Sequence, residues 1–195
     1  MPMLTRRFLL QAVPLFGVAT MVREAPLALA ASTNPDYGIP DLPVVTHEGK
    51  RVRFYSDLVR GRIVLINFMY STCKGICPGM TSNLKDVYRA LDGRVGRDVF
   101  MYSITLQPDK DTTEKLRAYV TRRGIGAGWS FLTGEAGDLE QIRKRLGFYD
   151  PNPEVDSDGA QHTGMLRIGN DARQRWLMCP ALAAPSAIIR SVSWM

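Results

Sequence analysis

Histidine and cysteine are scarce in this chain, whose 195 residues include 2 histidines and 3 cysteines. Two of the cysteines, Cys73 and Cys77, stand close together in the sequence. Two thiolates are too few for a structural zinc site or an iron–sulfur cluster, which commonly use about four protein ligands. The sequence also has no glycine-rich phosphate loop and no Ser-His-Asp ordering, so neither a nucleotide-binding enzyme nor a triad hydrolase is indicated.

Blocks of like charge are missing as well. The formal net charge is +6. Part of this positive charge belongs to residues 1–30, which contain three arginines (Arg6, Arg7 and Arg23) and one acidic residue, Glu24. The sequence lacks the lysine and arginine clusters that would indicate a nucleic-acid partner. Internal repeats and low-complexity tracts are absent, and 45% of the residues are hydrophobic. The length therefore predicts about one domain with a core of its own.

Residues 1–30 predict an export signal of the twin-arginine type. Arg6 and Arg7 precede an apolar stretch from Phe8 to Val22, which is shorter than the roughly 20 residues of a membrane-spanning helix. Ala28-Leu29-Ala30 has the small-x-small form that precedes signal cleavage. The alternatives are an amphipathic helix with two chance arginines, or an uncleaved membrane anchor. Export would lead to the periplasm, where oxidising conditions permit disulfides.

The rest of the chain predicts one α/β domain. Residues 31–43, punctuated by proline and glycine, are expected to be a linker, and 44–195 the folded domain. Strand and helix patterns then alternate, which favours a mostly parallel sheet flanked by helices. The expected central strands are 62–70, 98–106 and 129–133. Two hairpins are expected, one turning at Glu48-Gly49 and one at Asn170-Asp171. Helices are expected to begin at Pro78, at a capping box over Asp111–Glu114 and at Pro185, and a further helix is expected across Leu139–Leu146.

Cys73 and Cys77 fall where the strand at 62–70 meets the following helix. The amide groups and dipole of a helix N-terminus favour thiolates, so we expect a lowered pKa for these cysteines. Residues four apart share one face of a helix. Two thiolates there could bind one soft metal ion such as copper(I), or close on each other. The simpler alternative is a local structural disulfide in an exported protein.

A third ligand would strengthen the metal hypothesis, and the chain offers two histidines. His47 lies in the first hairpin turn and is expected to be solvated. His162 immediately precedes the strand at 163–169. In a thioredoxin-like sheet, the loop before this strand faces the helix that carries the cysteines. Thioredoxins place a cis-proline in that loop, and this chain has no proline between Pro153 and Pro180. His162 is therefore a candidate ligand, with an ordinary loop or core histidine as the alternative.

Four further residues near these motifs have simpler expected roles. Cys179 is interpreted as a free, buried core cysteine rather than a resolving thiol. Tyr70 is expected to form a wall of the site, and Asp109 and Asp111 are expected to cap a helix.

Together these segments resemble the SCO/SenC family of thioredoxin-like copper proteins. The resemblance rests on "CKGICP", "QPDKDTTEKLRAYV", "WSFLTG" and "HTGMLRIG", in order, over roughly residues 40–180. It implies a thioredoxin fold with an added hairpin and a copper ion bound by Cys73, Cys77 and His162. It also implies a role in assembling the binuclear copper centre of cytochrome c oxidase, by delivering copper or by reducing the target's cysteines. The implied partners are a copper-acceptor protein, such as an oxidase subunit, and a thiol reductant protein.

The sequence departs from the family pattern in two places. Gln107 and Gln161 stand where the family commonly has aspartate, which could alter hydrogen bonding around the ligands. The segment "QRWLMCPALAAPSAII" does not match the family clearly. The alternative function is a periplasmic thiol–disulfide oxidoreductase or thiol peroxidase, in which Cys73 attacks and Cys77 resolves. A copper carrier requires His162, whereas a simple dithiol reductase does not. No nucleic acid is expected as a partner, and a membrane only if the N-terminal segment is retained.

Overall fold

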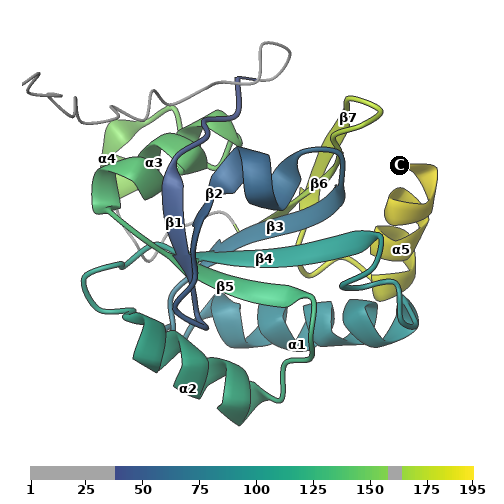
Figure 1. Ribbon diagram of the computed structural model, residues 1–195, viewed down its shortest axis with the longest axis horizontal. Helices are drawn as coiled ribbons and strands as arrows, with labels where there is room; N and C mark the ends of the chain where they lie inside the picture. Colours follow the sequence, from purple (N-terminus) through teal and green to yellow (C-terminus); the bar gives the residue numbers. More distant parts are fainter. Residues whose placement is uncertain (1–37, 158–163) are drawn as a thin grey trace, which may run out of the picture. The chain divides into compact units, whose positions relative to one another are not determined.

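A computed structural model describes residues 38–157 and 164–195. The expected export signal and His162 lie outside these residues. Seven strands form one sheet in the order β2-β1-β5-β4-β3-β6-β7 (Figure 1). Their bounds are β1 Pro43–Thr46, β2 Arg51–Arg53, β3 Ile63–Met69, β4 Val99–Thr105, β5 Trp129–Thr133, β6 Met165–Asn170 and β7 Arg175–Pro180.

The parallel part of the sheet consists of its three central strands. β3 pairs in parallel with β4, and β4 with β5. The two hairpins expected from the sequence extend this centre at both edges with antiparallel strands, β1–β2 beside β5 and β6–β7 beside β3. The expected α/β fold with added hairpins is therefore confirmed.

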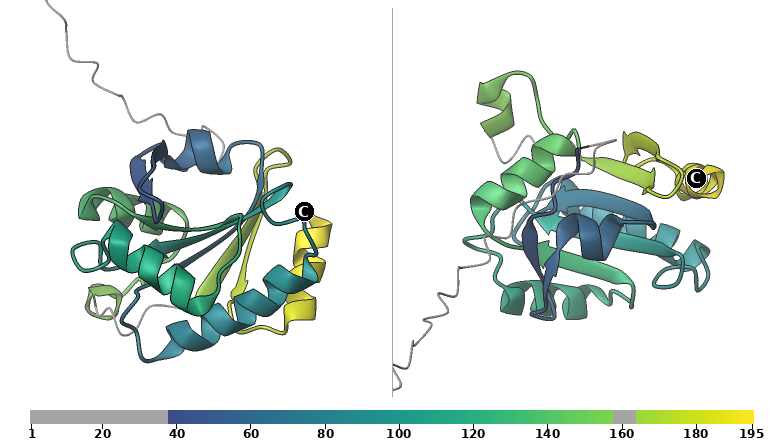
Figure 2. Two further views of the ribbon diagram at one scale, coloured as in Figure 1. Left: turned by 60° about the horizontal axis from the view of Figure 1, so that its bottom comes forward. Right: turned by 45° about the horizontal axis from the view of Figure 1, so that its top comes forward.

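Helices cover both faces of the sheet (Figure 2). Along β3, Val64, Ile66 and Phe68 point into one core, while Leu65 and Met69 point into the other, because successive strand side chains alternate between faces. The first core also receives the π-helix η1 (Phe54–Val59) and α3 (Ala136–Arg145); the second receives α1 (Ile76–Ala90), α2 (Thr113–Arg123) and α5 (Pro185–Trp194). A short helix, α4, spans Pro153–Ser157.

Three local expectations need correction. Ile39 and Leu42 were assigned to a linker but are buried in the core, since this segment packs beside β2 and η1. The first hairpin, expected over residues 43–56, ends at Arg53, and the residues from Phe54 form η1 instead. The N-cap of α2 is Thr112, whose side chain accepts from the Lys115 amide, so the expected capping box is wrong by one residue. Asp111 therefore does not cap α2, and its hydrogen bonds are described with the cysteine loop below.

Candidate metal centre

The junction between β3 and α1 places the two cysteines at the carboxyl edge of the parallel strands. β3 ends at Met69, and Gly75 is the N-cap of α1. Cys73 therefore lies before the helix and Cys77 within its first turn, so the expectation that both share one helical face is wrong. The Cys73 amide donates to the Tyr70 carbonyl, 3.2 Å away. This hydrogen bond closes a turn over residues 70–73. The Cys77 side chain hydrogen-bonds to that of Cys73.

The two thiols differ in exposure and in acidity. Cys77 is 1% exposed, whereas Cys73 is half-buried. Burial raises the pKa of Cys73, but hydrogen bonds from the Cys77 thiol, the amides of Cys77 and Gly75 and the Tyr70 side chain outweigh it and lower the pKa. Burial and the hydrogen bond to Cys73 raise the pKa of Cys77. The expected lowering by the helix N-terminus therefore holds for Cys73 and is wrong for Cys77.

Asp111 anchors the cysteine loop to the neighbouring strand. This carboxylate is 1% exposed. It accepts hydrogen bonds from the amide of Ser71 at 3.0 Å, from the Ser71 hydroxyl, and from the Thr105 hydroxyl at 2.6 Å. The expected helix cap is thus a buried acceptor that fixes the backbone two residues before Cys73. Sequence reasoning missed both partners: Ser71 lies 40 positions away and reaches Asp111 only because β3 pairs with β4, whereas Thr105 is met where the chain turns back after β4.

Three other expectations concern Tyr70, His47 and Cys179. Tyr70 does line the site, as expected, since its side chain hydrogen-bonds to Cys73. His47 is half-buried rather than solvated, because its Nδ1 accepts from the Phe131 amide at 3.2 Å. Burial lowers the pKa of His47. Cys179 is a free, half-buried thiol that packs against the α1-side core, and burial raises its pKa.

The strand that follows His162 begins beside the first turn of α1. Gly164 has a φ of +59°, and a Cβ built there would lie 2.5 Å from Cδ1 of Ile76. The Gly164 carbonyl also accepts from the Ala181 amide at 2.9 Å. Within residues 38–157 and 164–195, no three histidine, cysteine or acidic side chains gather as metal ligands would.

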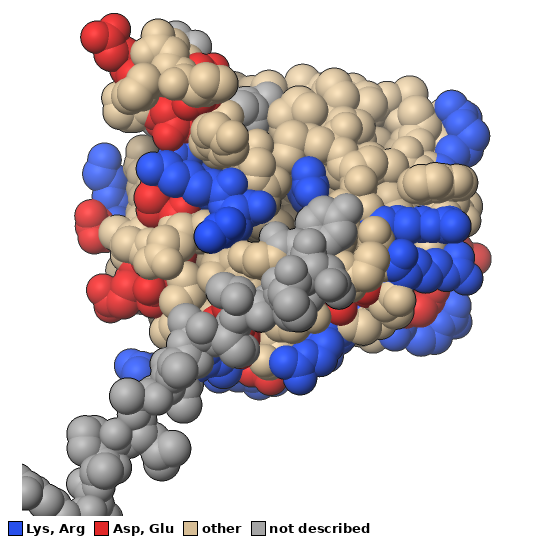
Figure 3. Space-filling model, turned by 90° about the horizontal axis from the view of Figure 1, so that it is seen from above, with Lys and Arg blue, Asp and Glu red and all other residues tan. Residues whose placement is uncertain are grey.

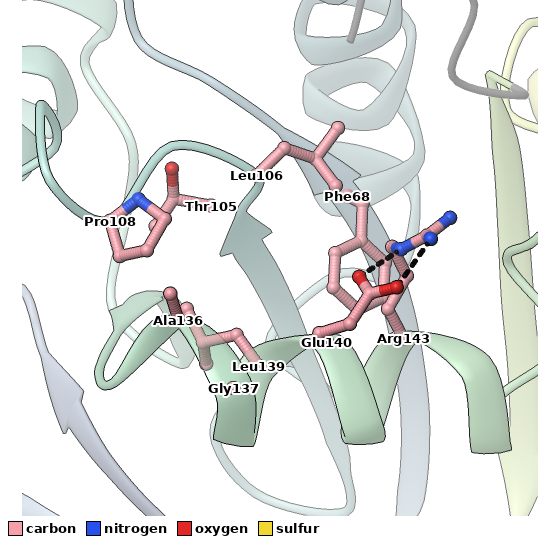
Figure 4. A pocket seen from close by; sticks show the side chains of 9 residues that line it. All are labelled: Phe68, Thr105, Leu106, Pro108, Ala136, Gly137, Leu139, Glu140 and Arg143. Atoms are coloured by element: carbon pink, nitrogen blue, oxygen red, sulfur yellow. Dashed lines mark hydrogen bonds and ion pairs between the residues drawn. The ribbon is translucent and has the colours of Figure 1, made fainter. Parts of the chain in front are cut away.

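A pocket of about 410 Å³ opens at the same edge of the sheet, on the α3 side (Figure 4). Phe68, Leu106 and Pro108 supply apolar walls, and Glu140 and Arg143 form an ion pair of 2.7 Å in its lining. The cysteines are not among its lining residues. The pocket is therefore separate from the thiol pair, which packs against the α1-side core.

Charged side chains of both signs occur on the face shown in Figure 3. Lysine and arginine lie beside aspartate and glutamate along its margins, and uncharged residues fill much of the area between them.

A model of the SCO1/SenC family matches residues 32–195. The chain belongs to the SCO1/SenC family. A SCO1 protein homolog of Bacillus subtilis is 27% identical over 141 residues, which are 71% of this chain and 72% of the relative.

Solved structures of the SCO1/SenC family share the fold. Bradyrhizobium japonicum ScoI, solved with copper bound, has a TM-score of 0.62 and 20% identity, covering 78% of this chain and 95% of that one. BsSco is described as having a disulfide switch and as a member of the Sco family of cytochrome c oxidase assembly proteins. It has a TM-score of 0.64 and 23% identity, covering 80% of this chain and 91% of that one. Among residues 38–157 and 164–195, no helix has the length and apolarity to cross a membrane.

Proposed function

We propose that this protein binds one copper ion through Cys73, Cys77 and His162 and passes it to a cysteine-bearing acceptor protein, such as a cytochrome c oxidase subunit. The observation that carries the proposal is the thiol pair, in which a half-buried Cys73 is hydrogen-bonded to Cys77. Thiolates are soft ligands that favour copper(I). The copper bound to B. japonicum ScoI, a protein of the same fold, supports copper as the metal.

His162 is proposed as the third ligand for two reasons. It precedes Gly164 by two residues, and two residues of chain span at most about 7 Å. Gly164 itself lies against Ile76, the residue next to Cys77. The other histidine, His47, accepts a backbone hydrogen bond from β5, which occupies its Nδ1.

The ligand assignment is tested by titrating copper into the reduced protein. Wild type is expected to bind about one copper(I), and Cys73→Ser or Cys77→Ser to abolish tight binding, because a hydroxyl is a poor ligand for a soft ion. The disulfide form is expected to take up no copper(I), since its sulfurs are not thiolates. Undiminished binding by either serine variant would refute the thiol site.

A second candidate function is reduction of the acceptor's disulfide, which the adjacency of the two thiols favours. The Cys73 thiolate would attack a target disulfide and form a mixed disulfide, releasing one target thiolate. Cys77 would then displace the second target thiolate, so that two electrons pass from the pair to the target. The disulfide switch described for BsSco is consistent with such a cycle.

His162→Ala distinguishes the two functions. In the copper carrier, the variant is expected to lose copper(II) affinity more than copper(I) affinity, because imidazole suits copper(II) while two thiolates already satisfy copper(I). Its disulfide exchange is expected to be almost unchanged. Retained copper(II) affinity together with lost thiol reactivity would instead make His162 a catalytic base of the reductase.

The location of this activity is also a proposal. We infer that residues 1–30 act as a twin-arginine export signal cleaved after Ala30, and that residues 44–195 work in the periplasm. Fractionation of cells producing the full chain, followed by N-terminal sequencing of the mature protein, tests both points. Replacing Arg6 and Arg7 by lysine is expected to block export. An uncleaved N-terminus in the membrane fraction would indicate the anchored alternative.

A further inference from the structure

We propose that the end of the sheet opposite the thiol pair binds the surface of a membrane that carries anionic phospholipids. This end consists of residues 60–62, 91–98, 171–175 and 190–195, and is called the arginine edge below. The proposal goes beyond the proposed copper function and does not depend on it, because it concerns the amino ends of the parallel strands rather than the carboxyl ends where Cys73 lies.

Strand pairing brings three of these segments together. β3 begins at Ile63, which pairs with Val99 of β4 and with Asn170 of β6. The Asp171 amide donates to the Arg62 carbonyl at 3.0 Å. The connections that precede β3 and β4 and the turn between β6 and β7 therefore lie side by side.

The end of α5 joins them. Asn170 donates from Nδ2 to the backbone oxygen of Met195 at 2.8 Å, and Arg173 donates to the same oxygen at 3.0 Å. Arg175 donates to the Trp194 carbonyl at 3.0 Å, and its guanidinium lies 4.9 Å from the centre of the Trp194 ring. The last turn of α5 is thus fixed to the turn between β6 and β7 (Figure 1).

The arginine edge carries the excess positive charge of the domain. Its side chains have a net charge of +4, from seven arginines and three aspartates. These are Arg60, Arg62, Arg94, Arg97, Arg173, Arg175 and Arg190, with Asp92, Asp98 and Asp171. Residues 31–195 as a whole also carry +4, because residues 1–30 contribute two of the six net charges of the chain. The arginines are scattered along the sequence, and the fold gathers them at one end of the sheet.

The positive groups of this edge are more accessible than the negative ones. Five of the arginines are exposed, namely Arg60, Arg97, Arg173, Arg175 and Arg190. Asp171 is only 4% exposed and accepts from the Gly61 amide at 2.8 Å. Asp98 pairs with both Arg94 and Arg97. Positively charged side chains gather at the right-hand margin of Figure 3, the side on which α5 ends in Figure 1.

The residue types at this edge fit a phospholipid surface. All of its positive side chains are arginine, although residues 31–195 also contain six lysines. A guanidinium binds phosphate oxygens through two parallel hydrogen bonds. Trp194 is 59% exposed, and an indole ring among cations is typical of the layer where headgroups meet acyl chains. Phosphate-bearing headgroups above an apolar layer would satisfy both the arginines and the tryptophan.

The position of the edge separates this occupant from the copper acceptor. The seven residues of β3 extend over about 20 Å, with residues 60–62 before them and Cys73 beyond their other end. A protein whose cysteine meets Cys73 therefore approaches the opposite end of the sheet. Because the proposed export signal brings the chain across a membrane, a lipid surface is at hand at the arginine edge while Cys73 stays open to its partner.

The test measures binding to sedimentable vesicles of phosphatidylcholine, alone or mixed with phosphatidylglycerol. Wild type is expected to bind the mixed vesicles only, and more weakly as salt screens the charges. Arg173→Gln with Arg175→Gln is expected to weaken binding roughly ten- to thirtyfold, because each arginine near an anionic surface contributes about a factor of five. Arg60→Gln with Arg97→Gln removes the same charge without touching α5, and the same loss is expected.

Matched controls separate this surface from general attraction. Lys110→Gln with Lys115→Gln removes two exposed charges on either side of Asp111, at the thiol-bearing end, and is expected to change binding by less than about twofold. Trp194→Ser is expected to weaken binding severalfold, whereas Tyr149→Ser, at a 51% exposed residue outside the edge, is expected to have no effect. Every variant keeps residues 1–37, so their contribution cancels in the ratio to wild type.

Several outcomes would overturn the proposal. Equal binding to neutral and mixed vesicles would do so, as would equal losses in the arginine variants and the lysine control. Full competition by inorganic phosphate at matched ionic strength would indicate a discrete anion site instead of a lipid surface. The alkylation rate of Cys73 is expected to be the same on vesicles as in solution, and protection of Cys73 would show that the wrong end faces the lipid. Copper(I) titration is a separate measurement, because a failed copper function would leave the vesicle ratios unchanged.

Discussion

The clearest prediction concerns Asp111, which joins the cysteine loop to β4. In Asp111→Ala, the Ser71 amide, the Ser71 hydroxyl and the Thr105 hydroxyl all lose their acceptor in a site where the carboxylate is 1% exposed. A hydrogen bond to a charged group contributes about 1.5–3 kcal/mol, and stranded buried donors add to the loss. Because the three bonds share one acceptor and are not independent, we expect the free energy of unfolding to fall by about 3–5 kcal/mol.

The matched control is Asp109→Ala. Asp109 lies in the same turn and carries the same charge, but it is exposed. Its replacement is expected to change the free energy of unfolding by no more than about 0.5 kcal/mol. Asp111→Asn is expected to fall between the two, since the amide oxygen still accepts while its NH₂ group meets a donor.

Urea unfolding measures these differences through the midpoint, provided that the slope is unchanged. The alkylation rate of Cys73 supplies a second measurement, because a released loop changes the hydrogen bonds at that thiol. If Asp111→Ala and Asp109→Ala unfold at the same urea concentration, the buried anchor contributes nothing and the reasoning is refuted.

Three more predictions follow from the same structure. Iodoacetamide is expected to modify Cys73 well before Cys77 at neutral pH, since hydrogen bonds lower the pKa of Cys73 while burial first of all raises that of Cys77; equal labelling in a mass-spectrometric time course would contradict this. Asp156→Asn is expected to cost about 1 kcal/mol at pH 7, a modest value for a partly exposed pair. The hydrogen bond from Arg143 lowers the pKa of Asp156 from 3.8 to about 2, so this stability is present above pH 3.8 and is lost as the pH falls toward 2. Melting temperatures of wild type and variant should therefore converge in acid, and a gap that persists at pH 2 would disprove the linkage. Gly164→Ala is expected to lower stability by roughly 1–3 kcal/mol, because a positive φ and contact with α1 both oppose a Cβ; an unchanged melting temperature would show that the strand start shifts freely.

The order of the elements and the reactive side chains could be predicted from local sequence patterns. Continuous apolar runs predicted the central strands, because both faces of such strands are buried. The spacing of Leu139 and Ile142 predicted α3, and Pro185 predicted the start of α5, since these signals are local. The pair Cys73 and Cys77 at a strand-to-helix junction was equally visible, because it depends on neighbouring residues alone.

How these residues act on one another depends instead on the packing of the folded chain. Cys73 and Cys77 are of one residue type and four positions apart, yet their pKa values move in opposite directions, because burial and hydrogen-bond direction are properties of the packed site. Asp111 faces Ser71 across 40 positions of sequence, and Leu182 reaches α1 from beyond the last strand. Such contacts join segments that are distant along the chain, and no local pattern encodes which of them will meet.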